Sequence, residues 1–332
     1  MRSTWLRALG ALVVTAGLAT AIVVSPALAA ASPSLRLLAE PNAGITPIDM
    51  LISSASRSVD LVIYELADPH LEALLAADAA RGVAVRVLLD RDDEESHNAA
   101  AADYLSAHRV AVRWPSDPGI DLTHEKAAVI DGRTALVMTM NLVTDDYATT
   151  RDFAVVDTTP ADVDAIESVF SADWRGVRVT PSNGADLVWS PGAEALLVSV
   201  INGAHNSLLV ENEEMADPYI TGPLEQAARR GVKVEITMTA SSSWDSAFDA
   251  LVAAGDSVRT YSSSAHLYIH AKAIVADPGR RDAQAFVGSQ NFSITSLVHN
   301  RELGIVTSVP SIVNGLAAVL ATDYAGGRPW RR

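Results

Sequence analysis

The chain contains no cysteine among its 332 residues. A cysteine nucleophile, a cysteine-ligated zinc ion and an iron–sulfur centre are therefore excluded. Disulfide bonds are excluded as well, so a hydrophobic core alone must hold the folded chain together. The length is enough for one large domain or for two of ordinary size.

Basic charge is also scarce. The sequence has 25 Lys and Arg against 40 Asp and Glu, which gives a formal net charge of −15. A surface of this sign repels polyphosphates at long range, and contacts to phosphate dominate the affinity of proteins for nucleic acids. The charge balance therefore disfavours a nucleic-acid substrate.

Long apolar runs are absent apart from one at the N-terminus. Two arginines precede the apolar run 8–24, and small residues at Ala27 and Ala29 follow it. This pattern predicts a cleaved signal peptide over residues 1–30 and a secreted, extracellular protein. An N-terminal membrane anchor is the alternative, since the run is close to the shortest length that spans a bilayer.

Lysine is rarer still, and two of the three lysines occupy the same sequence frame. Both frames read H-x-K-x-x-x-x-D, with His124, Lys126 and Asp131 in the first and His270, Lys272 and Asp277 in the second. In a chain with 8 histidines and 3 lysines, a repeated match of this kind is improbable by chance. The paired frames therefore indicate chemistry.

The frames belong to an internal duplication. Residues 58–69 align without gaps to residues 207–218, and the two frame histidines occupy equivalent places in the two copies. We expect an N-terminal half over residues 31–178 and a C-terminal half over residues 190–328. The segment 175–191, with its proline, glycine and asparagine breakers, joins them.

Each copy alternates apolar strand patterns with helical ones. In the first copy the pattern predicts helices over 46–56, 69–82, 94–107 and 161–174, and strands over 59–64, 83–89, 110–114, 126–130, 135–139 and 153–156. Asp68-Pro69 is a typical helix start, with a capping carboxylate followed by proline. We expect an α/β fold made of two similar α/β/α sandwich halves with mixed sheets, related by a pseudo-two-fold axis.

Further polar residues follow each frame at matching distances. They are Thr139, Asn141 and Asp152 in the first copy, and Ser289, Asn291 and Glu302 in the second. On a strand, residues two apart point to the same face, so the His and Lys of each frame project together, as do the hydroxyl and the Asn. If the two clusters meet across one cleft, they suit a phosphodiester. Lysine and asparagine donors stabilise its charged oxygens, one imidazole attacks phosphorus, and the other protonates the leaving group.

With these residues the chain resembles the phospholipase D superfamily, whose signature is H-x-K-x4-D followed by G-[ST]-x-N and a downstream acid. The resemblance covers nearly all of the chain after residue 30. It implies that His124 is the nucleophile and His270 the general acid, with no metal or other cofactor. Lys126 and Lys272 complete the catalytic set, and Thr139, Asn141, Ser289 and Asn291 are expected to bind substrate.

The carboxylates of the motif divide into two kinds. We expect Asp152 and Glu302 each to accept a hydrogen bond from the imidazole of its own half and to fix its orientation. Asp131 and Asp277 belong to the catalytic motif, but they lie an odd number of residues after the histidine. On a regular strand they face away from it, so we expect them to be structural charge partners.

The first copy departs from the superfamily signature at Met138, where the second copy has Gly288. Methionine adds bulk where glycine permits close backbone approach, and this predicts a narrower pocket or two unequal halves. A Met138 side chain filling the cleft would favour a non-catalytic binding protein on the same scaffold.

The leading hypothesis is a metal-independent phospholipase D that hydrolyses phospholipids at a membrane or micelle surface and exchanges head groups with alcohols. It would act as a monomer in which both halves form one site. A secreted endonuclease of the same superfamily is the first alternative, and a phosphatidyltransferase similar to cardiolipin synthase is the second. Trp244, Phe248 and Tyr268 are expected to line a lipid entrance or to pack in the core.

Overall fold

The computed structural model describes residues 34–115 and 119–331. The predicted signal peptide, residues 1–30, lies outside the described residues. Of the helices within the described ranges, none combines the length and the apolar composition needed to cross a bilayer.

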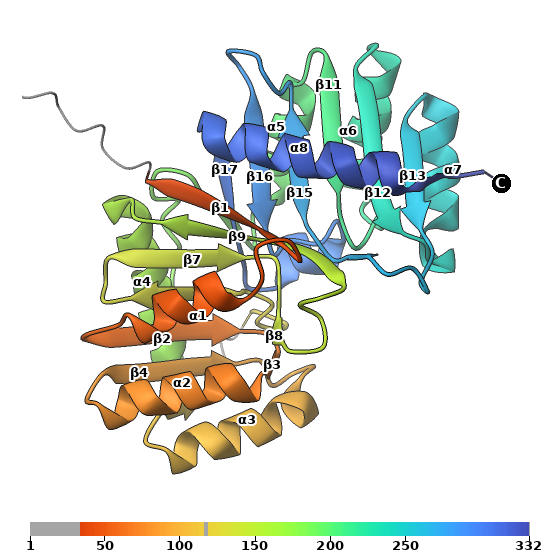
Figure 1. Cartoon of the computed structure of the whole chain (residues 1–332). Helices are drawn as coiled ribbons and strands as arrows, with labels where there is room; N and C mark the ends of the chain where they lie inside the picture. Colours follow the sequence, from red (N-terminus) through yellow and green to blue (C-terminus); the bar gives the residue numbers. More distant parts are fainter. Residues whose placement is uncertain (1–33, 116–118, 332) are drawn as a thin grey trace, which may run out of the picture. The chain divides into compact units, whose positions relative to one another are not determined.

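The N-terminal half forms one mixed sheet with four helices (Figure 1). Its strand order is β1-β9-β7-β6-β2-β4-β5, with β2, β4 and β5 parallel to one another. The elements are β1 (Leu35–Glu40), α1 (Thr46–Ser53), β2 (Ser58–Ile63), β3 (Leu66–Ala67), α2 (Pro69–Ala80), β4 (Ala84–Leu89), α3 (Glu95–Ala107), β5 (Ala111–Arg113), β6 (Ala127–Ile130), β7 (Thr134–Met138), β8 (Leu142–Val143), β9 (Thr150–Asp157) and α4 (Pro160–Arg175).

The C-terminal half repeats this order. Its sheet runs β10-β17-β16-β15-β11-β12-β13-β18, so each strand of the first sheet has a counterpart at the same place in the second. The elements are β10 (Leu187–Ser190), α5 (Glu194–Gly203), β11 (Ser207–Glu211), α6 (Pro218–Arg229), β12 (Lys233–Thr239), α7 (Asp245–Ala254), β13 (Ser257–Tyr261), β14 (Tyr268–Ile269), β15 (Ala273–Ala276), β16 (Gln284–Gly288), a π-helical turn (Thr295–His299), β17 (Glu302–Thr307), α8 (Pro310–Gly326) and β18 (Arg328–Pro329). The predicted duplication and α/β class are confirmed.

Local sequence accounts for the helix starts. The side chain of Asp68 accepts hydrogen bonds from the backbone N–H groups of His70 and Leu71 at the start of α2. Asp217 caps α6 in the same way through Tyr219. In both helices proline follows the capping aspartate, at a position where its missing N–H has no helical partner to lose.

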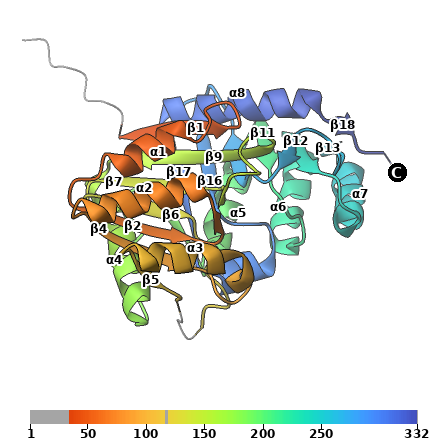
Figure 2. The ribbon, with the colours of Figure 1, turned by 60° about the horizontal axis from the view of Figure 1, so that its bottom comes forward.

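Three apolar clusters divide the described molecule into layers. One cluster joins α1, α2 and α3 to the outer face of the first sheet, and another joins α5, α6 and α7 to the outer face of the second. The third lies between the two sheets and includes side chains of α4 and α8. Figures 1 and 2 show α8 running across the strands of the second sheet, on the face opposite α5 and α6. The two halves therefore share one central core, and each covers the inner face of the other.

Two edge strands lie outside the sequence-based predictions. Strand β1 precedes the first predicted helix, and β10 falls within residues 175–191, which we expected to be a joining segment. Strand β10 consists of Leu187–Ser190, whose residues are all buried, and pairs antiparallel with β17. Proline, glycine and asparagine residues lie on either side of this short apolar run. The composition of the segment 175–191 therefore indicates a loop and does not reveal the strand.

The halves also exchange backbone pairing. Strand β14 of the C-terminal half pairs in parallel with β9, through Tyr268 with Thr150 and Ile269 with Arg151. The counterpart is a bridge between Thr123 and Arg301. In each half, the segment just before the frame histidine therefore pairs with the other half. The segment before His270 pairs beside Asp152, and the segment before His124 pairs beside Glu302.

Buried ion pairs reinforce this exchange. Arg151, on β9, donates from Nε to Asp323 Oδ2 on α8 at 2.5 Å, with 6% and 4% of the two side chains exposed. Arg301, just before β17, donates from Nε to Asp173 Oδ2 on α4 at 3.0 Å. Both pairs join one half to the closing helix of the other.

Replacing Arg151 with methionine should lower the free energy of unfolding by about 3–5 kcal/mol, because it leaves a buried carboxylate without its cation. The matched control is Arg229→Met, which breaks an exposed pair with Glu225 and should cost less than about 1 kcal/mol. Urea denaturation of both variants measures the difference. Equal losses for the two variants would show that the buried pair does not stabilise the docked halves.

Candidate active site

The two frame histidines lie at equivalent places, just before β6 and β15. The backbone N–H of His124 donates to the carbonyl of Arg301 at 3.0 Å, and that of His270 donates to the carbonyl of Arg151 at 3.2 Å. Both bonds cross between the halves. Each histidine is thus fixed at its backbone by the half that does not contain it.

The imidazole partners cross in the same way. Nδ1 of His124 lies 2.8 Å from Glu302 Oε2, and Nδ1 of His270 lies 2.8 Å from Asp152 Oδ1. The expectation that each carboxylate orients the histidine of its own half is therefore wrong. The reason is the exchanged strand pairing, which brings the start of β9 beside His270 and the start of β17 beside His124.

The two hydroxyls that follow the frames support these carboxylates. Thr139 Oγ1 donates to Asp152 Oδ1 at 2.5 Å and accepts from the N–H of Phe153. Ser289 Oγ accepts from the N–H of Leu303. Both residues are fully buried. Thr139 and Ser289 therefore lie behind the site, and the prediction that they bind substrate is wrong because their hydroxyls are already engaged.

A further hydroxyl was missed by sequence reasoning. Ser296, in the π-helical turn Thr295–His299, donates from Oγ to Glu302 Oε1 at 2.6 Å. Asn300 also reaches Oε1 of Glu302, at 3.3 Å. Short irregular turns of this kind often occur at functional sites, but no spacing rule in the sequence marks this one.

The two lysines are completely buried but have different surroundings. Lys126 Nζ donates to the carbonyl of His124 at 2.8 Å and lies 4.7 Å from the centroid of the Tyr64 ring. Burial, with Lys272 nearby, lowers the pKa of Lys126 to about 7. Lys272 Nζ instead donates to Glu213 Oε2 at 3.0 Å.

The pKa values of His124 and of its partner Glu302 are both lowered, for different reasons. Burial lowers the pKa of His124 and outweighs Glu302, which raises it. Burial acts to raise the pKa of Glu302, but His124 and Lys126 hold it below its usual value. A neutral imidazole whose Nδ1 is held by a carboxylate presents Nε2 as a nucleophile.

Both histidines line one cavity of about 360 Å³, which we call the central cavity. Its lining residues are Tyr64, Glu65, Glu94, His124, Asn141, Asp146, Thr150, Glu213, Glu214, Tyr268, His270 and Asn291. The frame histidines and the asparagine amides of both halves therefore line one cavity, whereas the frame lysines and aspartates are not among its lining residues. Five of the lining residues are acidic, and none of the described residues in this lining is lysine or arginine. A larger cavity of about 680 Å³ beside Trp114 and Arg301 contains neither histidine.

The aspartates that end the frames lie away from this cavity. Asp131 accepts from the backbone N–H groups of Ser56, Arg57 and Ser58, at the turn before β2. Asp277 accepts from the backbone N–H groups of residues 205–207, at the start of β11. Their grouping with the catalytic residues is therefore corrected to a structural role, which the odd spacing from the histidines had indicated.

Met138 does not fill the cleft. Its side chain is 1% exposed and packs in the outer core of the N-terminal half. A Cβ added to Gly288, its counterpart, would collide with the backbone of Gly304 and the side chain of Gln290. In the first half, Ala154 and Met140 stand at those two places, so the departure from glycine is an alternative packing of the sheet.

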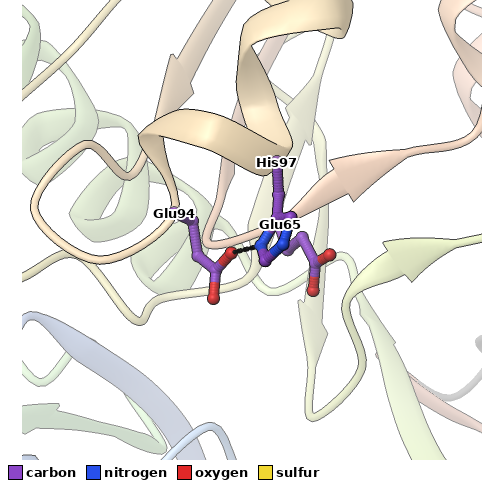
Figure 3. Close-up of side chains that lie close together, drawn as sticks. All are labelled: Glu65, Glu94 and His97. Carbon is purple, nitrogen blue, oxygen red and sulfur yellow. Dashed lines mark hydrogen bonds and ion pairs between the residues drawn. The ribbon is translucent and has the colours of Figure 1, made fainter.

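Near the cavity, Glu65, Glu94 and His97 gather their side chains (Figure 3). One potential ligand atom from each lies within 4.8 Å of the others, a combination found at no other place in the described ranges. His97 is exposed and its Nδ1 already bonds Glu94. Glu65 and Glu94 also line the central cavity, but the cluster contains neither frame histidine.

The aromatic residues before the second frame divide between core and surface. Phe248 is fully buried in the outer core of the C-terminal half. Trp244 and Tyr268 instead line a cavity of about 340 Å³ that shares Glu213 and Glu214 with the central cavity. We call it the side cavity. Aromatic faces beside carboxylates are a typical environment for a bound ammonium group.

Comparisons with known proteins agree with the duplicated architecture. The family described as "Cardiolipin synthase, PLD-like domain" matches residues 48–174 and again residues 197–324. A mitochondrial cardiolipin hydrolase of Xenopus tropicalis is 29% identical over 126 residues, which are 38% of this chain and 59% of that protein.

Two solved structures share the fold of the chain. A phosphatidylserine synthase of Haemophilus influenzae superposes with a TM-score of 0.68 at 12% identity, over 90% of this chain and 87% of that one. A polyphosphate kinase of Porphyromonas gingivalis gives 0.68 at 15% identity, over 86% of this chain and 46% of that one. The chain thus spans about half of the kinase and less than two thirds of the hydrolase.

The crossed pairing is testable by titration. Glu302→Gln should lower the pKa of His124 further, because the carboxylate that raises it is removed. Asp152→Asn should leave the His124 value close to wild type. NMR titration of the imidazole resonances in both variants measures this, and the reverse pattern would mean that each carboxylate serves its own half.

Proposed function

Because the chain belongs to the phospholipase D superfamily, we propose that it is a phosphodiesterase that cleaves phospholipids through a covalent phosphohistidine. The observation that carries this proposal is the central cavity, where two histidines, each oriented by a carboxylate, stand among acidic walls. The superfamily supports the reaction type, and the charge of the cavity supports the lipid.

The chemistry follows from the positions of the donors. Nε2 of His124 attacks phosphorus, and the leaving alcohol takes a proton from His270. The amides of Asn141 and Asn291, which both line the cavity, stabilise the negative oxygens together with the buried lysines. Water then attacks the phosphohistidine and His270 takes its proton. The asparagine amides and the lysine side chains supply the charge stabilisation in this scheme.

The negative charge of the residues that line the central cavity favours a lipid substrate over a nucleic acid. Five carboxylates around the histidines would repel a polynucleotide, whose binding needs cationic contacts to many phosphates. A choline or ethanolamine head group carries a positive charge that suits the same walls. The side cavity, with Trp244 and Tyr268 beside Glu214, offers such a cation two aromatic faces.

Transfer of the phosphatidyl group to an alcohol is the second candidate. The description of the matched family names cardiolipin synthase, an activity of this kind, and the name of the Xenopus tropicalis relative refers to cardiolipin hydrolysis. The same phosphohistidine serves both outcomes, because water and an alcohol attack the same phosphorus. The acceptor present in the cavity would decide between them.

An assay of the purified chain with EDTA should release choline or ethanolamine from vesicles and leave single-stranded DNA intact. His124→Ala and His270→Ala should each lose about 10²-fold or more in rate, as expected for groups that exchange protons or bonds with the substrate. Adding an alcohol should divert part of the product to the transferred lipid. Cleavage of DNA with no lipid product would overturn the proposal in favour of a nuclease.

The covalent intermediate separates the two histidines. With a phospholipid labelled in its phosphatidyl part, His270→Ala should accumulate acid-labile label on the protein, and His124→Ala should show none. Mass spectrometry of peptides from rapidly quenched reactions locates the adduct. Label on His270 in the His124→Ala variant would reverse the assigned order.

A further inference from the structure

The internal repeat places Glu213 where the N-terminal half has Tyr64. The aligned segments 58–69 and 207–218 differ at this pair in both charge and shape. The two residues also occupy equivalent places in the fold, within two residues of the ends of β2 and β11, and both line the central cavity. The site is therefore built from two halves that are similar in backbone and unequal in chemistry.

The Glu213 carboxylate lies among the motif side chains of its own half. Its Oε2 accepts from Lys272 Nζ at 3.0 Å and from Asn291 Nδ2 at 3.5 Å, and lies 3.4 Å from His270 Nε2. Tyr268 donates from its hydroxyl to Oε1 at 2.9 Å. Burial acts to raise the pKa of Glu213, but Lys272 and His270 outweigh it and hold the pKa well below its usual range.

Tyr64 gives the first half a different environment. Its ring meets the His124 ring edge-on, with the centroids 4.6 Å apart, and lies beneath Lys126. No carboxylate of the described residues is paired with Nε2 of His124, whose only ion-pair partner is Glu302 at Nδ1. His124 therefore faces the cavity with one nitrogen held and the other available.

His270 is flanked on both ring nitrogens. Asp152 lies at Nδ1 and Glu213 at Nε2, at 2.8 and 3.4 Å. Asp146, before β9, acts on the ring as a further negative charge. The other groups that face it from its own segment are Lys272, which is paired with Glu213, and Tyr268, whose ring stacks at 6.5 Å. The second contact is an ion-pair distance, and a ring with hydrogen on both nitrogens carries the positive charge that suits carboxylates on both sides.

We propose that Glu213 is a positioning residue that keeps the second proton on His270 and so makes His270 the general acid and His124 the nucleophile. This inference rests on the proposed function for its catalytic consequence, and its structural part stands without it. Glu213 also pairs with Lys272, whereas Lys126 donates to the carbonyl of His124, so the two lysines differ in their partners.

The proton balance of the reaction is complete under this assignment. His124 Nε2 forms a bond to phosphorus as the bond to the leaving oxygen breaks, and the Nε2 proton of His270 moves to that oxygen. In the second step a water oxygen bonds to phosphorus, the phosphorus–nitrogen bond breaks, and one water proton returns to His270. Glu213 then again faces a doubly protonated ring.

The first test is NMR titration of the full chain without substrate. In Glu213→Gln the His270 ring should lose its second proton at a lower pH than in wild type, and His124 should titrate as before. Glu213→Tyr, which copies Tyr64, should act in the same sense. The matched control is Glu235→Gln, which removes a carboxylate bonded to Lys233 on β12 and should change neither ring. An unchanged His270 titration in both Glu213 variants would overturn the proposal.

The second test is the pH profile of phospholipid cleavage. In Glu213→Gln the fall of kcat on the alkaline side should begin at lower pH, with kcat at pH 8 reduced by about 10- to 100-fold. KM should change less than kcat, because the variant alters proton supply more than binding. A uniform loss at every pH would reveal a purely structural role. Absence of any lipid cleavage by wild type would sink the proposed function and leave the titration result to stand alone.

Discussion

The site depends on an exchange between the halves at the start of β9 and β17. Each frame histidine is bound at its backbone by the strand of the other half and at Nδ1 by that half's carboxylate. The ion pairs of Arg151 and Arg301 join the same two strands to the opposite closing helices. Docking the halves and orienting the histidines are therefore one event, and neither half holds an oriented imidazole by itself.

Burial then sets the chemistry of the charged groups. Both lysines lie out of contact with water, where each ammonium needs nearby acceptors or an aromatic face to remain charged. Lys126 has a carbonyl and the Tyr64 ring, whereas Lys272 has the Glu213 carboxylate. Because one half has the Tyr64 ring where the other has the Glu213 carboxylate, the charge around the two histidines is unequal. A pseudo-symmetric scaffold can in this way run an asymmetric reaction, in which one histidine must be neutral and the other protonated.

The sequence predicted which residues form the site better than it predicted the hydrogen bonds between them. The repeat predicted the duplicated sheets, and the frames predicted that His124, His270, Asn141 and Asn291 would converge on one cavity. Strand periodicity says which face a side chain takes, but it does not say which half that face will meet, so the crossed carboxylates were missed. The hydroxyls of Thr139 and Ser289 were misplaced because backbone groups one strand away engage them. Glu213 was within reach of sequence reasoning, since the repeat alignment sets it against Tyr64.

In the proposed reaction the two halves build a single phosphate centre, with His124 at one side and His270 at the other. A crystal structure of the full chain with tungstate, a phosphate analogue, tests it most directly. We expect one tungstate in the central cavity, with its metal at bonding distance from His124 Nε2 and an oxygen within hydrogen-bond distance of His270. Tungstate bound instead in the larger cavity beside Trp114 and Arg301, with the central cavity empty, would contradict it.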